Sequence, residues 1–142
     1  MGTASEYTLR QILDALSGGI GLFPHQVWDI DGIIQVIENN SVENGEELVY
    51  VVPAGRVFYL TSIRVYFRNT TQTDRTGRLF LKDTEGVYIG EWPFDAPSLS
   101  TEGIVVPFAP PVKLEAGQTV YIYSDGAGMW TYATITGYTL PV

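Results

Sequence analysis

From position 48 onward, apolar and polar side chains alternate in short stretches that are separated by turn residues. The alternation is clearest in the stretch 57–68, which contains the run Ile63, Arg64, Val65, Tyr66, Phe67 and Arg68. Successive side chains of a β-strand point to opposite faces of the sheet, so this pattern predicts a strand with one buried face. Stretches that end in turn signals about every 8–12 residues are typical of an all-β sandwich or barrel.

The pattern predicts about eight strands from position 48 onward, preceded by one further strand at 33–37. The expected strands are 33–37, 48–52, 57–68, 78–82, 87–92, 104–108, 112–114, 120–123 and 130–140. Between them we expect a polar loop over 39–47 that turns at Asn44-Gly45, and a long loop over 93–102. Pro110-Pro111 is expected to separate the strand 104–108 from the strand 112–114.

One internal repeat supports a design of two sheets. Residues 52–62 and 114–124 both read as an apolar residue, an Ala-Gly turn, and then a strand with a Tyr-apolar pair and a Ser. Two such segments about sixty residues apart do not make a solenoid, whose repeats must be more numerous. They suit the two halves of a jelly roll, which is a pair of Greek keys. We therefore expect an antiparallel, jelly-roll-like β-sandwich.

The first 40 residues differ from the rest of the chain. Leu9, Ile12, Leu13 and Leu16 have the spacing that lines one face of a helix, with Thr8 as N-cap and Gly18-Gly19 as its end. A helix of this length is only marginally stable by itself in water. We therefore expect its apolar face to dock on the β-domain of the same chain or on a neighbouring subunit. An extended apolar arm over 20–34 follows. We expect residues 1–40 to be a docking and oligomerisation segment, and residues 41–142 to be the β-sandwich domain.

The charge balance and the absence of cysteine exclude several functions. The chain of 142 residues has a net charge of −8 with only 8 Lys and Arg, whereas nucleic-acid binding needs clustered cations. Without cysteine, disulfides, thiolate nucleophiles and Cys-based metal sites are excluded. No apolar run approaches the length that crosses a bilayer, and no secretory signal is visible. We expect neither nucleic acid nor a membrane as a partner.

The candidates for metal binding and acid–base catalysis are weak. His25 is the single histidine and has no nucleophile motif near it. Asp29-Ile30-Asp31-Gly32 begins like a calcium loop, but Ile33 and Asn40 stand where further ligands are needed. Calcium held jointly by other turns, with Asp83, Glu85 or Asp125 as ligands, is left open. We expect no catalytic residues, metal or cofactor.

Glu91, Trp92 and Asp95 form the most suggestive group for a glycosidase, because that reaction needs two facing carboxylates and Trp stacks on sugars. The alternative is an edge strand that enters a loop, and the spacing favours that interpretation. A hydrolase is therefore the third-ranked hypothesis.

Aromatic side chains on the polar faces of the strands are the better lead. Tyr66 and Phe80 share strand faces with Arg and Lys, Tyr121 and Tyr123 share one face, and Trp130 flanks a glycine-rich tip. Exposed Tyr, Trp and Arg are the residue types that dominate interfaces, although some of these faces could be the far side of a core. As candidate glycan or partner contacts we select Trp92, Trp130, Tyr66 and Tyr123, together with the tips 69–76 and 125–128.

Three segments carry a resemblance to a known group of proteins. They are 52–63 (VPAGRVFYLTSI), 107–121 (PFAPPVKLEAGQTVY) and the closing Gly137-Tyr138. Over residues 48–142 the chain resembles small jelly-roll proteins of tailed-bacteriophage virions, namely the head-decoration, head-fibre and tail-appendage modules. The resemblance implies a homotrimer on a virion, with the N-terminal segment reaching to a neighbouring subunit or to the shell.

The leading hypothesis is therefore a non-enzymatic virion structural protein, assembled in the host cytoplasm, that decorates or cements a phage capsid. Its expected partners are other copies of itself, as a homotrimer, and the major capsid protein or another virion protein. The residues expected to dock the arm are Leu9, Ile12, Leu13, Leu16, Phe23 and Trp28. The second hypothesis is a receptor- or glycan-binding tail or fibre module.

Overall fold

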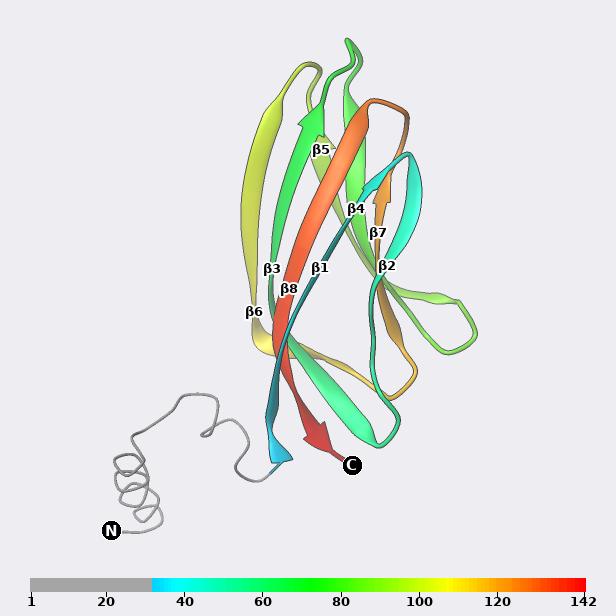
Figure 1. The fold of residues 1–142 in the computed structure, drawn as a ribbon, viewed down its shortest axis with the longest axis vertical. Coiled ribbons are helices and arrows are strands. Elements are labelled where there is room, and N and C mark those ends of the chain that lie inside the picture. Colours follow the sequence, from blue (N-terminus) through cyan, green and yellow to red (C-terminus); the bar gives the residue numbers. More distant parts are fainter. Residues whose placement is uncertain (1–31) are drawn as a thin grey trace, which may run out of the picture. The chain divides into compact units, whose positions relative to one another are not determined.

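The computed structural model describes residues 32–142, and these residues form eight β-strands (Figure 1). The strands are β1 (Ile34–Glu43), β2 (Gly45–Val51), β3 (Arg56–Asn69), β4 (Arg75–Lys82), β5 (Tyr88–Ala96), β6 (Thr101–Leu114), β7 (Thr119–Ser124) and β8 (Met129–Pro141). The expectation of a β-sandwich of about eight strands is confirmed. The helix expected at 8–19 and most of the arm expected at 20–34 lie outside the described residues.

The strands form two four-stranded sheets whose orders are β1-β8-β3-β6 and β2-β7-β4-β5. We call these the β8 sheet and the β7 sheet. The pairs β4–β5, β3–β6, β2–β7 and β1–β8 are nested, as if one long hairpin with its turn between β4 and β5 had been rolled up. Rolling also brings β8 beside β3 and β7 beside β4. This strand order is that of a jelly roll.

The core lies between the two sheets and is made by every second residue of the central strands. Ile63, Val65 and Phe67 of β3 are buried, whereas Arg64, Tyr66 and Arg68 alternate with them and are exposed. The same alternation holds for Val120 and Ile122 of β7, and for Thr131, Ala133 and Ile135 of β8. Period-two alternation therefore marks the buried face of each of these strands, as predicted for the stretch 57–68.

The polar segment 39–47 was expected to be a loop, and this expectation was wrong. It forms the second half of β1 and the start of β2, which lie in different sheets, and the chain turns between them where predicted, at Asn44 (φ 62°) and Gly45 (φ 124°). β1 and β2 are edge strands, so their outward positions are polar, while Val42 and Val49 point inward and are buried. A short strand with polar residues on its solvent face has the composition of a loop, which explains the error.

The prolines led to two further errors, at 93–102 and at 110–111. β5 continues through Pro93 to Ala96, with Phe94 and Ala96 pointing into the core, and β6 begins at Thr101. β6 also runs through Pro110 and Pro111, with a bulge where its pairing with β3 shifts between Leu60 and Ser62. β5 and β6 are both sheet edges, where a proline whose nitrogen faces away from the neighbouring strand, or which lies at a bulge, removes no bond of the ladder.

The two segments of the internal repeat form matching turns that lie against each other. In each turn the fourth residue donates its backbone N–H to the first, Arg56 to Pro53 (3.2 Å) and Gln118 to Glu115 (3.1 Å). Gly55 (φ 78°) and Gly117 (φ 85°) occupy the third position, where a type II turn needs a positive φ. Gly117 donates to the carbonyl of Val52 (2.9 Å), and Val52 donates to that of Gln118 (3.0 Å). The repeat therefore marks two equivalent crossings between the sheets, β2 to β3 and β6 to β7.

Among residues 32–142 no helix has the length and apolar character needed to span a membrane.

Candidate functional site

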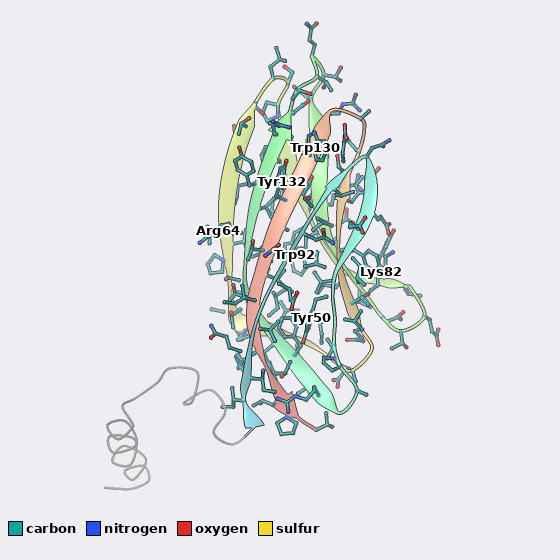
Figure 2. The ribbon with its side chains drawn as sticks, viewed as in Figure 1. Tyr50, Arg64, Lys82, Trp92, Trp130 and Tyr132 are labelled. Atoms are coloured by element: carbon teal, nitrogen blue, oxygen red, sulfur yellow. The ribbon has the colours of Figure 1, made fainter. Side chains whose placement is uncertain are left out.

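The outer face of the β8 sheet carries a contiguous row of aromatic rings, Tyr66, Tyr132 and Trp130, which we call the aromatic row. Tyr66 of β3 lies directly opposite Tyr132 of β8, and their ring centroids are 5.5 Å apart. Trp130 is two residues from Tyr132 on the same face, with centroids 6.3 Å apart and rings inclined by 15°. Such cross-strand and same-face pairs follow from the pleat, which returns to the same side every second residue. Figure 2 shows Trp130 and Tyr132 one after the other along β8.

The surroundings of the aromatic row are open and include cations. Tyr66 is 45% exposed, and Val105 on the neighbouring β6 is 61% exposed. Arg64 and Arg68 are exposed on either side of Tyr66 along β3. None of these residues forms a salt bridge within the described part of the chain. The aromatic row and its arginines are therefore free to contact another molecule.

A hollow of about 260 Å³ adjoins the aromatic row at Tyr132, between β1 and β8. It is lined by Asn39, Asn40, Ser41, Tyr132, Ala133 and Thr134. The amide of Asn40 is already engaged, because its nitrogen donates to the carbonyl of Leu48 (2.8 Å) and its oxygen accepts from the N–H of Ser41 (2.8 Å). The hollow thus offers an aromatic edge together with hydroxyl and amide groups from two strands.

The outer face of the β7 sheet also carries aromatic and charged residues, but here they contact one another. We call Glu46, Phe80, Lys82, Tyr88 and Tyr121 the cation–aromatic cluster. The Lys82 Nζ donates to Glu46 Oε1 (2.8 Å) and lies 4.1 Å from the ring centroid of Tyr121 and 5.1 Å from that of Tyr88. Tyr88 donates its hydroxyl to Glu46 Oε2 (3.0 Å) and stacks on Phe80 with centroids 4.5 Å apart. The polar ends of this cluster are therefore already satisfied.

The pKa directions in the cluster follow from these bonds. The hydrogen bond from Lys82 lowers the pKa of the Glu46 carboxyl, opposed by burial and assisted by the bond from Tyr88. The bond to Glu46 raises the pKa of the Lys82 ammonium, and it also raises the pKa of the Tyr88 hydroxyl. The shifts of Glu46 and Lys82 favour the ionised carboxylate and ammonium, and the shift of Tyr88 keeps its hydroxyl protonated as the donor to Glu46.

Phe80 corrects one expectation. It lies on the outward face of β4, as the alternation predicted, but only 4% of its surface is exposed. The ring of Tyr88 covers it from β5, and Tyr123 of β7 approaches it with centroids 6.1 Å apart. A side chain on the solvent face of a sheet is thus buried by its cross-strand neighbours.

The structure distributes the four candidate glycan contacts over three places. Tyr66 and Trp130 come together in the aromatic row. Tyr123 lies on the outer face of the other sheet, where the guanidinium of Arg78 is 5.4 Å from its ring centroid. Trp92 points inward from β5, packs against the core and contacts Phe108 edge-on, with centroids 5.1 Å apart. Whether any of them binds a glycan stays a prediction.

Sequence reasoning passed over Tyr132, the centre of the aromatic row. The available signal was its position two residues after Trp130 on the same strand face. Its pairing with Tyr66 depends on the neighbourhood of β3 and β8, which the sequence does not reveal.

The carboxylates that suggested chemistry are not assembled into a site. Glu91 pairs with Arg78 (3.5 Å) and points outward from β5, as Asp95 does, but the four residue steps of strand that separate them span about 13 Å, which is too far for two catalytic carboxylates. Trp92 points to the opposite side of β5. Asp83 accepts the backbone N–H groups of Glu85 and Val87, and Asp125 accepts that of Thr76. Within residues 32–142 no three His, Asp or Glu side chains lie close enough to hold a metal ion. His25, Asp29 and Asp31 lie outside the described residues.

Asn69 organises the tip between β3 and β4, although sequence reasoning did not select it. It is 1% exposed, and its amide donates to the carbonyls of Thr73 (2.8 Å) and Ala96 (2.9 Å). Its side-chain oxygen accepts from the N–H of Thr71 (2.9 Å), which is the geometry of an Asx-turn. This buried amide fastens the tip to β5, so the tip is held as part of the sandwich.

The described part of the chain is therefore an eight-stranded jelly roll whose accessible aromatic and charged side chains lie on its outer faces. No protein-family model and no curated protein matches the sequence. Among solved structures, 76% of this chain is similar to 88% of a protein of the disulfide-linked pili on Bacillus endospores, with 15% identity and a TM-score of 0.41.

Two viral proteins show similarities of the same order. A protein of infectious bursal disease virus, strain Gx, matches 77% of this chain over 32% of its own length, with 12% identity and a TM-score of 0.40. A protein of tomato aspermy virus matches 72% of this chain over 76% of its own length, with 10% identity and a TM-score of 0.35. None of these values assigns the chain to a family.

Proposed function

We propose that this protein is a non-enzymatic structural protein of a bacteriophage virion that decorates or cements the capsid as a homotrimer. Its partners are other copies of itself and the major capsid protein or another virion protein. The residues proposed to dock the N-terminal segment, all outside the described region, are Leu9, Ile12, Leu13, Leu16, Phe23 and Trp28.

The observation that carries the proposal is the open aromatic row with Arg64 and Arg68 beside it. Trp, Tyr and Arg are the residue types that supply most of the binding energy at protein interfaces. On the outer face of the β7 sheet, the charged and aromatic side chains already bond to one another. On the outer face of the β8 sheet, the aromatic rings contact one another, but the arginines beside them have no such partner within residues 32–142. A rigid sandwich with one such face suits an assembly contact better than catalysis.

The mass of the full chain in solution tests the proposal. By sedimentation at micromolar concentration we expect a species of three times the chain mass of 15.7 kDa. The double variant Leu13→Asp with Leu16→Asp should dissociate it, because charges on a docked apolar stripe are costly to bury. The matched control is Leu99→Asp, which places a charge on a side chain that is 66% exposed and should leave the oligomer intact. A wild-type monomer would contradict the proposal.

Association with particles tests the location. An antibody against the chain should label virions of the phage that encodes it, and the protein should sediment with capsids. Label on free protein alone would refute a virion role even if the protein is a trimer.

A second candidate function is a receptor- or glycan-binding module, and the hollow beside Tyr132 favours it. Hydroxyl and amide groups next to aromatic rings match the hydroxyl groups and apolar C–H faces of a sugar. A glycan array should then give specific binding that Tyr132→Ala abolishes, while Tyr123→Ala on the other sheet leaves it intact. An array without signal would eliminate this function.

A further inference from the structure

The sandwich has four edge strands, and they differ in how well they are protected against pairing with another strand. β5 and β6, on one side, carry Pro93 and the three prolines Pro107, Pro110 and Pro111. β1 and β2, on the other side, carry none. Proline lacks the N–H that an added strand would need, and it is a common means of protecting an edge. One side of the sandwich is therefore closed to strand addition, while the other is open.

The backbone of β2 has a free donor on this open side. Val52 exchanges both of its backbone hydrogen bonds with the turn before β7, at Gly117 and Gln118. Within a strand the N–H and C=O groups of successive residues point to alternate sides, so those of Val51 point away from β7. Nearer to the turn between β1 and β2, the side chain of Asn40 already donates to the carbonyl of Leu48. The unoccupied part of the edge therefore begins beyond Leu48 and includes Val51.

Apolar side chains accompany this free backbone. Leu48 is 37% exposed and Val51 is 45% exposed, although both lie on a strand of a folded sandwich. Leu48 lies opposite Tyr121 of the cation–aromatic cluster, so the apolar surface continues onto the outer face of the β7 sheet. A strand added beside β2 would cover these side chains.

The N-terminal segment has a sequence that matches this edge. Residues 25–31 follow Pro24, contain neither Pro nor Gly, and place Trp28 and Ile30 in alternation with Asp29 and Asp31. This alternation is typical of a strand with one apolar face. Seven extended residues span about 23 Å, which is more than enough to cover the part of the β2 edge beyond Leu48.

We propose that residues 25–31 of one copy add as a strand to the free edge of β2 in a second copy, and so extend the β7 sheet to a fifth strand. Main-chain hydrogen bonds would supply affinity, and the exposed Leu48 and Val51 would receive the apolar side chains. The inference rests on the proposed oligomer and specifies where its N-terminal segment docks.

The substitution Val51→Pro tests whether the backbone N–H of Val51 is needed for assembly. The N–H of Val51 takes no part in the pairing with β7, so proline is compatible with the folded sandwich, but it removes the donor and places a ring at the edge. We expect the oligomer to dissociate at least about tenfold more readily in sedimentation, with the melting temperature of the sandwich retained. Val51→Thr, which keeps the N–H and the β-branched shape, is the matched control and should change the dissociation constant less than about threefold.

The results separate this inference from the proposed function. If the wild type is a monomer, the proposed oligomer itself fails. If Val51→Pro assembles as the wild type does, while Leu13→Asp with Leu16→Asp does not, the oligomer stands and the β2 edge is not the acceptor.

Disulfide cross-linking tests whether residues 25–31 occupy the β2 edge of a second copy. Because the chain has no cysteine, single cysteines introduced at positions 26 to 30 can be mixed with a tagged Val51→Cys chain without background. A disulfide between the two chains at one or more positions is expected, and none with a tagged Val105→Cys chain, whose cysteine lies on the proline-containing edge. The absence of any mixed-chain disulfide at all five positions would overturn the proposal.

Discussion

The two outer faces of the sandwich use the same kinds of residue in opposite ways. On the β7 sheet, Lys82 lies between Glu46 and two tyrosine rings, and Tyr88 seals Phe80 from solvent. On the β8 sheet, Tyr66, Tyr132 and Trp130 contact one another, while Arg64 and Arg68 form no salt bridge within residues 32–142. A face whose groups satisfy one another contributes to the fold. A face whose groups remain open is available for a partner.

The strongest test of this contrast is Phe80→Ala. Truncation of a buried Phe costs about 3–5 kcal/mol, because it removes apolar contacts and leaves a cavity beneath Tyr88. Chemical denaturation should show this loss, whereas Tyr66→Ala on the open face should cost less than about 1 kcal/mol. Equal losses at the two positions would mean that both faces serve the fold equally.

The second test concerns assembly. The double variant Tyr66→Ala with Trp130→Ala should weaken the oligomer or its attachment to the capsid by about 2 kcal/mol or more, because the two rings have the character of interface hot spots. Sedimentation and capsid-binding assays measure this effect. The control Tyr88→Ala lies on the outer face of the β7 sheet, whose groups bond to one another. It should keep the dissociation constant of the assembly within about twofold of the wild-type value. The opposite ranking would assign this contact to the outer face of the β7 sheet.

The third test is the pH dependence of the Glu46–Lys82 pair. Because the pKa of Glu46 is lowered in the folded state, its contribution to stability is complete above the ordinary carboxyl pKa and disappears as the pH falls through the lowered value. The raised pKa of Lys82 makes its contribution disappear only as the pH rises through that raised value. The melting temperature of wild type should therefore exceed that of Glu46→Gln at neutral pH, and the difference should vanish in acid.

If the difference in melting temperature between wild type and Glu46→Gln persists unchanged below the folded-state pKa of Glu46, the charge of the carboxylate is not the source of its stabilising effect. Glu47→Gln is the control, since the Glu47 side chain forms no salt bridge or side-chain hydrogen bond with other residues of 32–142, and it should change the melting temperature little at any pH.

The smallest expected effect belongs to Arg64. Arg64→Ala removes an exposed side chain without an ion pair in residues 32–142, so the free energy of unfolding should change by less than about 0.5 kcal/mol. If this arginine serves a partner, the same variant should slow assembly with an acidic surface and should change its salt dependence. A marked loss of stability would show that Arg64 belongs to the fold.

The sequence predicted strand faces well and strand neighbours poorly. Alternation placed Ile63, Val65 and Phe67 inside and Tyr66 outside, because the pleat acts on each strand separately. It did not reveal that Pro93 and Pro110 are tolerated within strands, since that depends on β5 and β6 being sheet edges. The aromatic row illustrates the same limit, because Trp130 and Tyr66 become a site only when β8 lies beside β3.

By itself, the sequence determined that residues from position 48 onward form an antiparallel β-sandwich with alternating faces, because hydrophobic burial acts on a local, period-two pattern. Only the tertiary structure decided which strands form the edges, which outward aromatic side chains are covered and which remain open. Those outcomes depend on contacts between residues far apart in the chain: Tyr88 lies over Phe80, Tyr132 lies beside Tyr66, and β2 has no neighbour beyond β7 within the sheet.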